Sequence, residues 1–174
     1  ITAVSVAISS CKKIVDVEPK NIVGVENMYR NVFDADAAVV GVYGKFMKLA
    51  KPYMILNELR GDLMDITNNA DLNLRQVSEH TATVNNPYTD PQPFYDVIVN
   101  CNDVLDNFKK MYAASKLKEA EFNQRYSDVG AIRSWVYLQL GIHYGTIPYV
   151  TNPVLQVQDL KDNSNFPKLT LPVL

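Results

Sequence analysis

Val129–Thr151 reads VGAIRSWVYLQLGIHYGTIPYVT and decides the fold class of this chain. Seven of the ten residues from Trp135 to Tyr144 are apolar or aromatic and none is charged, which is typical of a helix that is buried nearly all round. Gly145 offers a helix stop, and Pro148 prevents the helix from resuming. A helix covered on all sides needs neighbours on all sides, so we predict a multi-helix, all-α architecture.

Two more stripes of apolar residues have helical spacing. The first follows Asp34, its expected N-cap, and runs to Lys51, where Pro52 ends or kinks the helix. Its members are Ala35, Val39, Val42, Phe46 and Leu49. The second follows Asp90, again an expected cap, and is the clearest amphipathic pattern in the chain. Its members are Phe94, Ile98, Cys101, Leu105 and Phe108.

The remaining organisation is a short helix, a long loop and one long helix. Residues 53–65 predict the short helix, and the Asn-, Asp-, Thr- and Pro-rich residues 66–92 predict a loop. Such a loop inside a compact domain is usually functional or mobile. The last helix should run from about Leu117 to Tyr144 and measure about 40 Å. No alternating pattern predicts a strand.

Composition excludes some classes of protein. The chain has 174 residues, of which 47% are hydrophobic and 21% charged, so it is a globular chain long enough to bury a sizeable core. Its formal net charge is −2, and no basic stripe is available to neutralise a phosphate backbone. We therefore expect no nucleic-acid partner.

The N-terminus suggests lipid modification. The apolar residues 1–10 end in small side chains directly before Cys11, as the remnant of a secretory signal peptide would. We expect cleavage before Cys11 and diacylation of its thiol, with residues 11–32 as an extended leader to a helical domain over 33–174. An ordinary buried strand with an incidental cysteine remains the alternative. Cys101 is expected to be buried and inert, although a disulfide with Cys11 would compete with lipidation.

Four segments resemble the SusD/RagB-like outer-membrane nutrient-binding lipoproteins, in the right order. They are the lipobox-like Cys11, the stretch Glu58-Leu-Arg-Gly-Asp62, the stretch Asn86-Pro-Tyr-x-Asp-Pro-x-Pro-Phe-Tyr95 with Ile98 and Asn100-Cys-Asn102, and the run Arg133–Thr151. In the last, Ala-x-Arg-x-Trp-x-Tyr-x-Gln-Leu is followed by Tyr-Gly-x-x-Pro-Tyr-x-Thr. Members are much longer, so the chain corresponds to the N-terminal portion of the family's domain.

The resemblance implies a fold and a function. The fold would be a tetratricopeptide-like array of helical hairpins with long loops, although this sequence shows no tetratricopeptide period of its own. The protein would be lipid-anchored and surface-exposed at the cell outer membrane. It would bind a glycan, or equally a peptide, and deliver it to a SusC-like TonB-dependent transporter. This is binding and gating, without catalysis and without a cofactor.

Reactive motifs are scarce. His80 and His143 are the only histidines and have no partner at zinc-ligand spacing, so we expect no metal site. Glu58, Asp62 and Asp65 could share a helix face and do acid–base work or bind a cation, but capping and salt-bridge roles are the favoured interpretation. No nucleophile elbow or glycine-rich phosphate loop occurs. A helical-repeat adaptor that binds only proteins, and a surface-anchored hydrolase, remain alternatives.

The 66–92 segment holds the candidate ligand contacts. Asn73 and Asn85 offer amides, Arg75 a cation and Tyr88 a ring, as sugar sites require. For the adjoining Asn86-Pro87 we favour a turn. Trp135, Tyr137 and Tyr144 are expected to pack in the core rather than stack on sugars. Arg133, the one cation beside them, is expected to pair with a buried carboxylate, and we suggest Asp62.

Overall fold

The computed structural model describes residues 28–161, 164 and 166–171. Its helices are α2 (Val32–Phe46), α3 (Ala50–Tyr53), α4 (Leu72–Ser78), α5 (Gln92–Ala113) and α6 (Glu119–Tyr144). Short 3-10 turns cover Met47–Leu49, Pro87–Thr89 and Val157–Leu160, and a π-helical segment covers Met54–Leu59. The two strands are β1 (Ile147–Pro148) and β2 (Lys168–Leu169). The fold is therefore all-α apart from this small pair of strands, as predicted.

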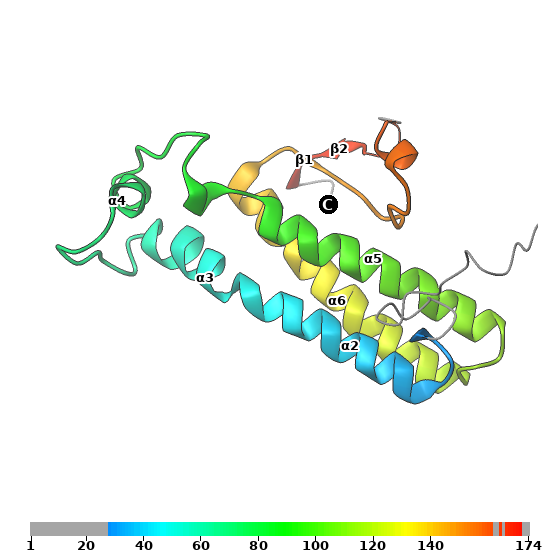
Figure 1. Ribbon diagram of the computed structural model, residues 1–174. Helices are drawn as coiled ribbons and strands as arrows, with labels where there is room; N and C mark the ends of the chain where they lie inside the picture. Colours follow the sequence, from blue (N-terminus) through cyan, green and yellow to red (C-terminus); the bar gives the residue numbers. More distant parts are fainter. Residues whose placement is uncertain (1–27, 162–163, 165, 172–174) are drawn as a thin grey trace, which may run out of the picture.

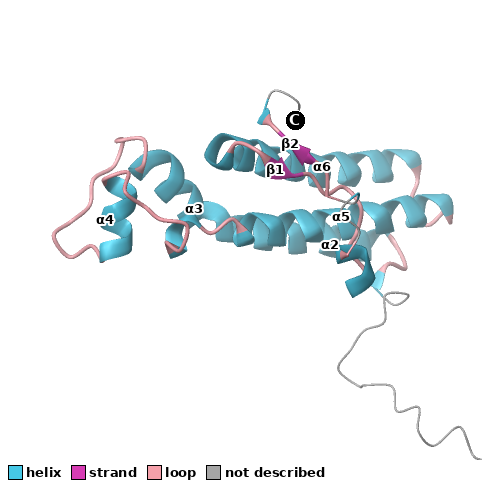
Figure 2. Ribbon diagram, turned by 90° about the horizontal axis from the view of Figure 1, so that it is seen from above, coloured by secondary structure: helices cyan, strands magenta, loops and turns pink. Residues whose placement is uncertain are grey.

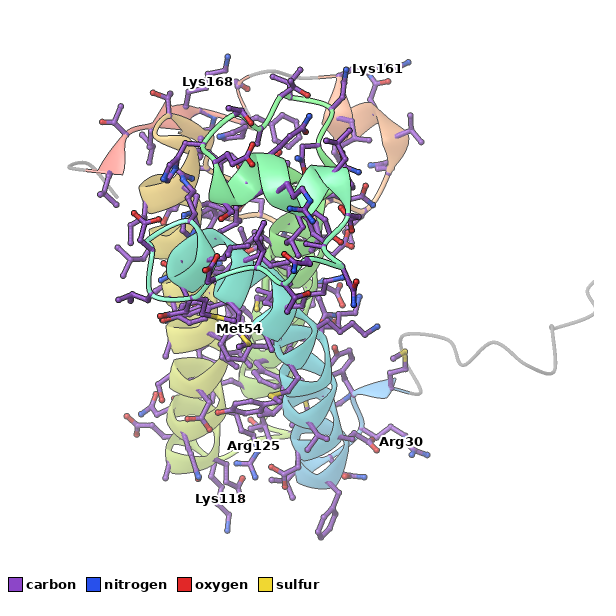
Figure 3. All side chains as sticks on the ribbon, turned by 90° about the vertical axis from the view of Figure 1, so that its left-hand side faces the viewer. Arg30, Met54, Lys118, Arg125, Lys161 and Lys168 are labelled. Atoms are coloured by element: carbon purple, nitrogen blue, oxygen red, sulfur yellow. The ribbon has the colours of Figure 1, made fainter. Side chains whose placement is uncertain are left out.

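Three long helices, α2, α5 and α6, lie side by side and form the body of the molecule (Figure 1). The largest helix–helix contact joins α5 and α6, and α2 packs on both of them. Seen from above, α4 and the loops around it extend beyond one end of this bundle, next to α3 (Figure 2). The labelled cations Arg30, Lys118 and Arg125 lie toward the opposite end from Lys161 and Lys168 (Figure 3), so positive charge is dispersed.

The apolar stripe predicted for α5 is confirmed. Every member is buried, and four side chains, Phe94, Ile98, Cys101 and Phe108, have no exposed surface. The predicted stripe of the first helix is buried at Ala35, Val39 and Val42 on α2 and at Leu49 in the turn after it, and it belongs to the same core. Removal of this apolar surface from water, at about 25 cal/mol per Å², stabilises the bundle together with the larger interface between α5 and α6.

Helix α6 is less enclosed than its composition predicts. It ends at Tyr144 as expected, because Gly145 adopts φ +73° and gives its N–H to the carbonyl of Gly141 at 3.0 Å. However, Leu138 and Ile142 are 46% and 48% exposed, so the prediction of burial nearly all round is wrong. Trp135 is half-buried and packs against Phe46 and Tyr53, with ring centroids 5.1 and 5.5 Å away. The described part of the chain places helices on only two sides of α6.

These exposed apolar side chains should cause self-association. Leu138 and Ile142 lie four residues apart, about one helical turn, and exposed apolar side chains also occur at Val40 on α2 and at Met47 in the 3-10 turn after it. We predict that Leu138→Lys combined with Ile142→Lys reduces oligomerisation in analytical ultracentrifugation, with little change in melting temperature because neither side chain is in the core. A polar control, Ser134→Lys on the same face of α6, should have a smaller effect. Unchanged association of the double variant would contradict the prediction.

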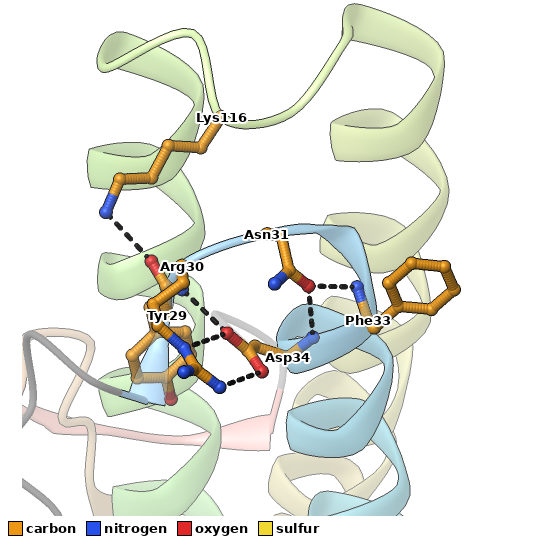
Figure 4. Close-up of polar contacts among 6 residues, drawn as sticks. All are labelled: Tyr29, Arg30, Asn31, Phe33, Asp34 and Lys116. Carbon is orange, nitrogen blue, oxygen red and sulfur yellow. Dashed lines mark hydrogen bonds and ion pairs between the residues drawn. The ribbon is translucent and has the colours of Figure 1, made fainter.

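The start of α2 differs from the prediction. Asn31, not Asp34, is the N-cap: its Oδ1 accepts the N–H groups of Phe33 at 2.9 Å and Asp34 at 3.2 Å (Figure 4). Asp34 sits in the first helical turn and accepts hydrogen bonds from the backbone and guanidinium of Arg30 at 2.9 and 3.1 Å. These bonds hold the pKa of Asp34 below its usual value. A carboxylate there also suits the positive end of the helix dipole.

The packed part of the chain includes Tyr29, ahead of α2. Its ring meets Phe108 edge-on, with centroids 6.4 Å apart, and its carbonyl accepts a hydrogen bond from Lys116 Nζ at 3.0 Å (Figure 4). Burial raises the pKa of Tyr29 to about 12. Cys11 and residues 1–27, on which the predicted signal remnant and lipid anchor depend, lie outside the described residues.

Pro52 does not end the first helix but changes its winding. Proline has no N–H to give to the carbonyl one turn before it, and the chain passes from α2 through a 3-10 turn, α3 and then the π-helical segment Met54–Leu59. The predicted separate helix over 53–65 is therefore a continuation that stops at Leu59. Asn57 secures the π-helical segment: its amide donates to the carbonyl of Tyr53 and to Gln139 Oε1 on α6, both at 3.1 Å.

Residues 66–92 are not a loop throughout. Asp71 caps the short helix α4 by accepting the N–H of Leu74 at 2.9 Å, and Val77 on this helix is buried. The predicted turn at Asn86 is confirmed, since its Oδ1 accepts the N–H of Tyr88 at 3.0 Å. A seven-residue helix has too few turns for its periodicity to be recognised.

The strands β1 and β2 correct the prediction that no strand occurs. They pair antiparallel, with Ile147 opposite Leu169 and Pro148 opposite Lys168. Each strand has two residues, which is too short to display an alternating pattern.

Arg133 pairs with an amide, not with Asp62. Its Nη1 donates to Asn102 Oδ1 at 2.7 Å, and the Asn102 amide donates to the carbonyl of Val150 at 2.7 Å. Tyr137 completes this network: its hydroxyl donates to the same carbonyl at 2.6 Å and accepts the N–H of Val150 at 2.8 Å. The network ties the segment after α6 back onto α5, so these residues of the family-like motifs have a structural role here.

Candidate functional site

A cavity of about 510 Å³ lies where the π-helical segment, the end of α4, the loop after it and the end of α6 meet. This volume falls within the roughly 300–1,000 Å³ typical of small-molecule sites. Its walls combine apolar, hydroxyl, imidazole and guanidinium groups. The lining residues are Leu56, Arg60, Val77, His80, Ala82, Thr83, Val84, Thr89, Pro91, His143 and Tyr144.

The π-helical segment positions Arg60. The backbone N–H of Arg60 donates to the carbonyl of Ile55, five residues earlier, at 3.1 Å, and such π-helical bonds often mark functional sites. Gly61 follows because a Cβ at this position would collide with the backbone carbonyl oxygen of Asn57. The glycine therefore allows the tight turn that ends the segment at the cavity wall.

Arg60 is a cation without a protein partner. Its side chain makes no hydrogen bond or ion pair with any residue that the structure describes, and it is exposed at the cavity. By contrast, Arg30 pairs with Asp34, Arg125 with Asp36 and Arg133 with Asn102. An unpaired guanidinium on a cavity wall is available to a ligand.

His143 lines the same cavity from the end of α6. Its Nε2 is shielded from solvent and has no hydrogen-bond partner among the described residues. Burial, and then the nearby positive charge of Arg60, lower the pKa of this imidazole below its ordinary value of 6.5. His143 is therefore neutral at neutral pH, with one ring nitrogen not yet satisfied.

Acidification should expose this buried imidazole as a pH-dependent loss of stability. The pKa of His143 is lowered in the folded chain, so below about pH 6.5 the unfolded chain binds the proton first and stability falls, whereas above that pH both states are neutral. We predict that the melting temperature falls between pH 7 and pH 5 and that His143→Asn flattens this slope. His80→Asn is the control and should retain it. Equal slopes for wild type and His143→Asn would contradict the assignment.

Tyr144 and His80 complete the polar wall. The Tyr144 hydroxyl donates to the carbonyl of Thr89 at 3.1 Å, and burial raises its pKa to about 12, so it stays protonated. His80 adopts φ +56°, a left-handed conformation that costs energy for a side chain of this kind. Its Nε2 lies 4.0 Å from Asp62 Oδ1, at an exposed position.

The four predicted ligand contacts do not line this cavity. Arg75 donates to the carbonyl of Asn68 at 2.7 Å, and the backbone carbonyl of Asn73 accepts the amide of Asn86 at 2.8 Å. Asn85 is exposed next to this turn. Tyr88 lines two smaller cavities of about 350 and 460 Å³, with Lys51 Nζ 5.0 Å above its ring and Asp71 Oδ2 accepting its hydroxyl at 2.7 Å. The structure thus places these residues near the cavity, in the same end of the molecule, and their role in binding stays a prediction.

The cavity residues come from three parts of the sequence and had no motif to reveal them. Arg60, His80 and His143 are separated by tens of residues and meet only in the folded chain. Within the described ranges, no three His, Cys, Asp or Glu side chains are grouped to hold a metal ion. Cys101 is buried and free, and burial raises the pKa of its thiol to about 11, so it is not a nucleophile.

No family model, curated protein or solved structure matches this chain. Among the described residues, no helix is both long and apolar enough to cross a membrane.

Proposed function

We propose that this chain belongs to a cell-surface lipoprotein of the SusD/RagB-like kind, which captures a nutrient, in the first place a glycan, and passes it to a SusC-like TonB-dependent transporter. Cys11 would carry the lipid that holds it at the outer membrane. The protein would act by binding alone. The observation that carries the proposal is the mixed apolar and polar cavity beside Arg60, His80 and His143.

The cavity chemistry supports binding of a sugar-like molecule. The exposed residues Ala82, Val84 and Pro91 supply apolar surface for the C–H face of a ring, and Thr83 supplies a hydroxyl group. The exposed guanidinium of Arg60 adds hydrogen-bond donors. A mostly apolar wall with a few polar groups is the usual composition of a small-molecule site.

The architecture supports the same proposal. Helices α5 and α6 form an antiparallel hairpin with a short connection between Ala113 and Glu119, and α2 lies alongside it (Figure 1). We propose that this hairpin is one unit of a tetratricopeptide-like array. In such arrays the helices form a rigid scaffold and the loops between them carry the binding surface.

Direct binding tests the proposal. Calorimetry of the complete protein against a panel of neutral and acidic oligosaccharides should find a ligand, and Arg60→Gln should weaken its binding. Arg30→Gln removes the same charge at the opposite end of the bundle and should bind as wild type does. Co-purification with a TonB-dependent barrel from outer membranes tests the second half of the proposal. Absence of both a glycan ligand and a barrel would overturn it.

A protein-binding adaptor is the second candidate, and the exposed apolar side chains of α6 favour it. In that case binding would depend on Leu138 and Ile142 rather than on Arg60. The Leu138→Lys, Ile142→Lys double variant would then lose its protein partner while Arg60→Gln kept it. The same pair of variants therefore separates the two functions.

A further inference from the structure

The charge of the cavity is one-sided. Its ionisable lining groups are Arg60, His80, His143 and Tyr144, and no aspartate or glutamate lines it. Two acids act on lining residues from outside: Asp62, 4.0 Å from His80, and Asp90, whose charge contributes to the raised pKa of Tyr144. Both lie outside the lining, so a ligand inside the cavity meets cations and neutral donors first.

The guanidinium of Arg60 and the imidazole of His143 indicate which ligand group would bind in the cavity. Arg60 has no partner among the described residues, and its charge reaches His143 closely enough to lower the pKa of that imidazole. A guanidinium presents its donors as a planar fork that fits the two oxygens of a carboxylate. His143 lines the same cavity, and its unpaired Nε2 is shielded from solvent, so it becomes a second donor when the imidazole turns to face the ligand.

We propose, on the basis of the function proposed above, that this cavity selects acidic sugars, with Arg60 as the carboxylate-binding residue and His143 as the second donor. The exposed apolar residues Val84 and Pro91 face the sugar ring in this arrangement. The remaining hydroxyls of the ligand are left to Thr83 and to water.

The proposal also specifies a pH dependence. A bound anion favours protonation of His143, so ligand and proton bind cooperatively and affinity rises as the pH falls toward 5. Arg60 from the π-helical segment is the charged group that acts on His143. His80 and Tyr144 line the same cavity, Asp62 lies 4.0 Å from His80, and the charge of Asp90 acts on Tyr144. The variant His80→Asn is the control for the second imidazole.

The test compares ligands that differ only in charge. Calorimetry on the complete protein uses a panel of oligouronates (galacturonate, glucuronate and mannuronate trimers), each beside its fully methyl-esterified form, and an acidic pentapeptide. We expect at least one oligouronate to bind more tightly than its ester, with affinity falling as salt is added. Arg60→Gln should weaken that binding about 10- to 100-fold. Arg60→Lys keeps the positive charge and should bind more tightly than Arg60→Gln but less tightly than wild type. Because Arg60 is exposed and unpaired, melting temperatures should not change.

The outcomes separate the two proposals. Binding of neutral glycans or esters with no preference for the acid, or an acid preference that survives Arg60→Gln, overturns the inference and leaves the proposed function standing. Binding of the pentapeptide alone assigns the cavity to peptides and overturns the inference as well. Failure of every saccharide to bind overturns the inference, and the absence of a co-purifying TonB-dependent barrel as well overturns the proposed function itself.

Discussion

Replacing Phe108 with alanine is expected to lower the free energy of unfolding by about 3–5 kcal/mol. Phe108 has no exposed surface and belongs to the hydrophobic core that α5 shares with α2 and α6. The ring of Tyr29 meets it edge-on. Removing the ring loses its burial and leaves a cavity that close-packed helices cannot fill. Urea unfolding followed by circular dichroism measures the loss.

Trp135→Ala is the matched comparison, because the sequence presents Trp135 as the more conspicuous core residue. Its indole is half-buried, and its ring contacts are Phe46 and Tyr53. A side chain that keeps part of its surface in water loses less on truncation, so Trp135→Ala should cost less than Phe108→Ala. A larger loss in the free energy of unfolding for Trp135→Ala than for Phe108→Ala would contradict this prediction.

Tyr137→Phe should destabilise the protein by about 1–3 kcal/mol although it removes only one oxygen atom. The Tyr137 hydroxyl both donates to the carbonyl and accepts from the N–H of Val150, and all three groups are buried. After the substitution the carbonyl keeps its hydrogen bond from Asn102, but the N–H loses its partner. Thermal and urea unfolding would show the loss, and hydrogen exchange of the Val150 amide would show where it arises.

Tyr149→Phe is the control for this substitution. Its ring lies 4.7 Å from that of Tyr137, but its hydroxyl has no hydrogen bond to any described residue. We expect a change within about 0.5 kcal/mol, as for an ordinary peripheral site. Equal losses from Tyr137→Phe and Tyr149→Phe would show that the hydrogen bonds to Val150 contribute nothing specific.

The success of the sequence in predicting α5 has a simple cause. Helical periodicity is a property of neighbouring residues, so Phe94, Ile98, Cys101, Leu105 and Phe108 define one face whatever surrounds them. The same applies to the end of α6 at Gly145, where the backbone needs a positive φ that glycine adopts freely. Both predictions needed only local information.

Other predictions failed where the answer depended on distant residues. The partner of Arg133 is Asn102 on α5 rather than a carboxylate, and nothing near Arg133 in sequence indicates this. The cap of α2 is a local exception: Asn31 caps the helix, and Asp34 lies in its first turn, where it pairs with Arg30. The apolar composition of α6 does not reveal how many other segments pack around it. The exposure of Leu138 could therefore not be predicted from the sequence.

Sequence alone determined that the chain is helical, where its longest helices lie and which face of α5 is buried, because these follow from spacing, capping and glycine stops within a few residues. Only the tertiary structure decided the cavity. It brings together Arg60 from the end of a π-helical segment, His80 from a loop and His143 from the end of α6, and Arg60 has no partner among the residues that the structure describes. Such a meeting depends on how helices far apart in sequence cross one another, which is set by packing over the whole bundle and not by any local pattern.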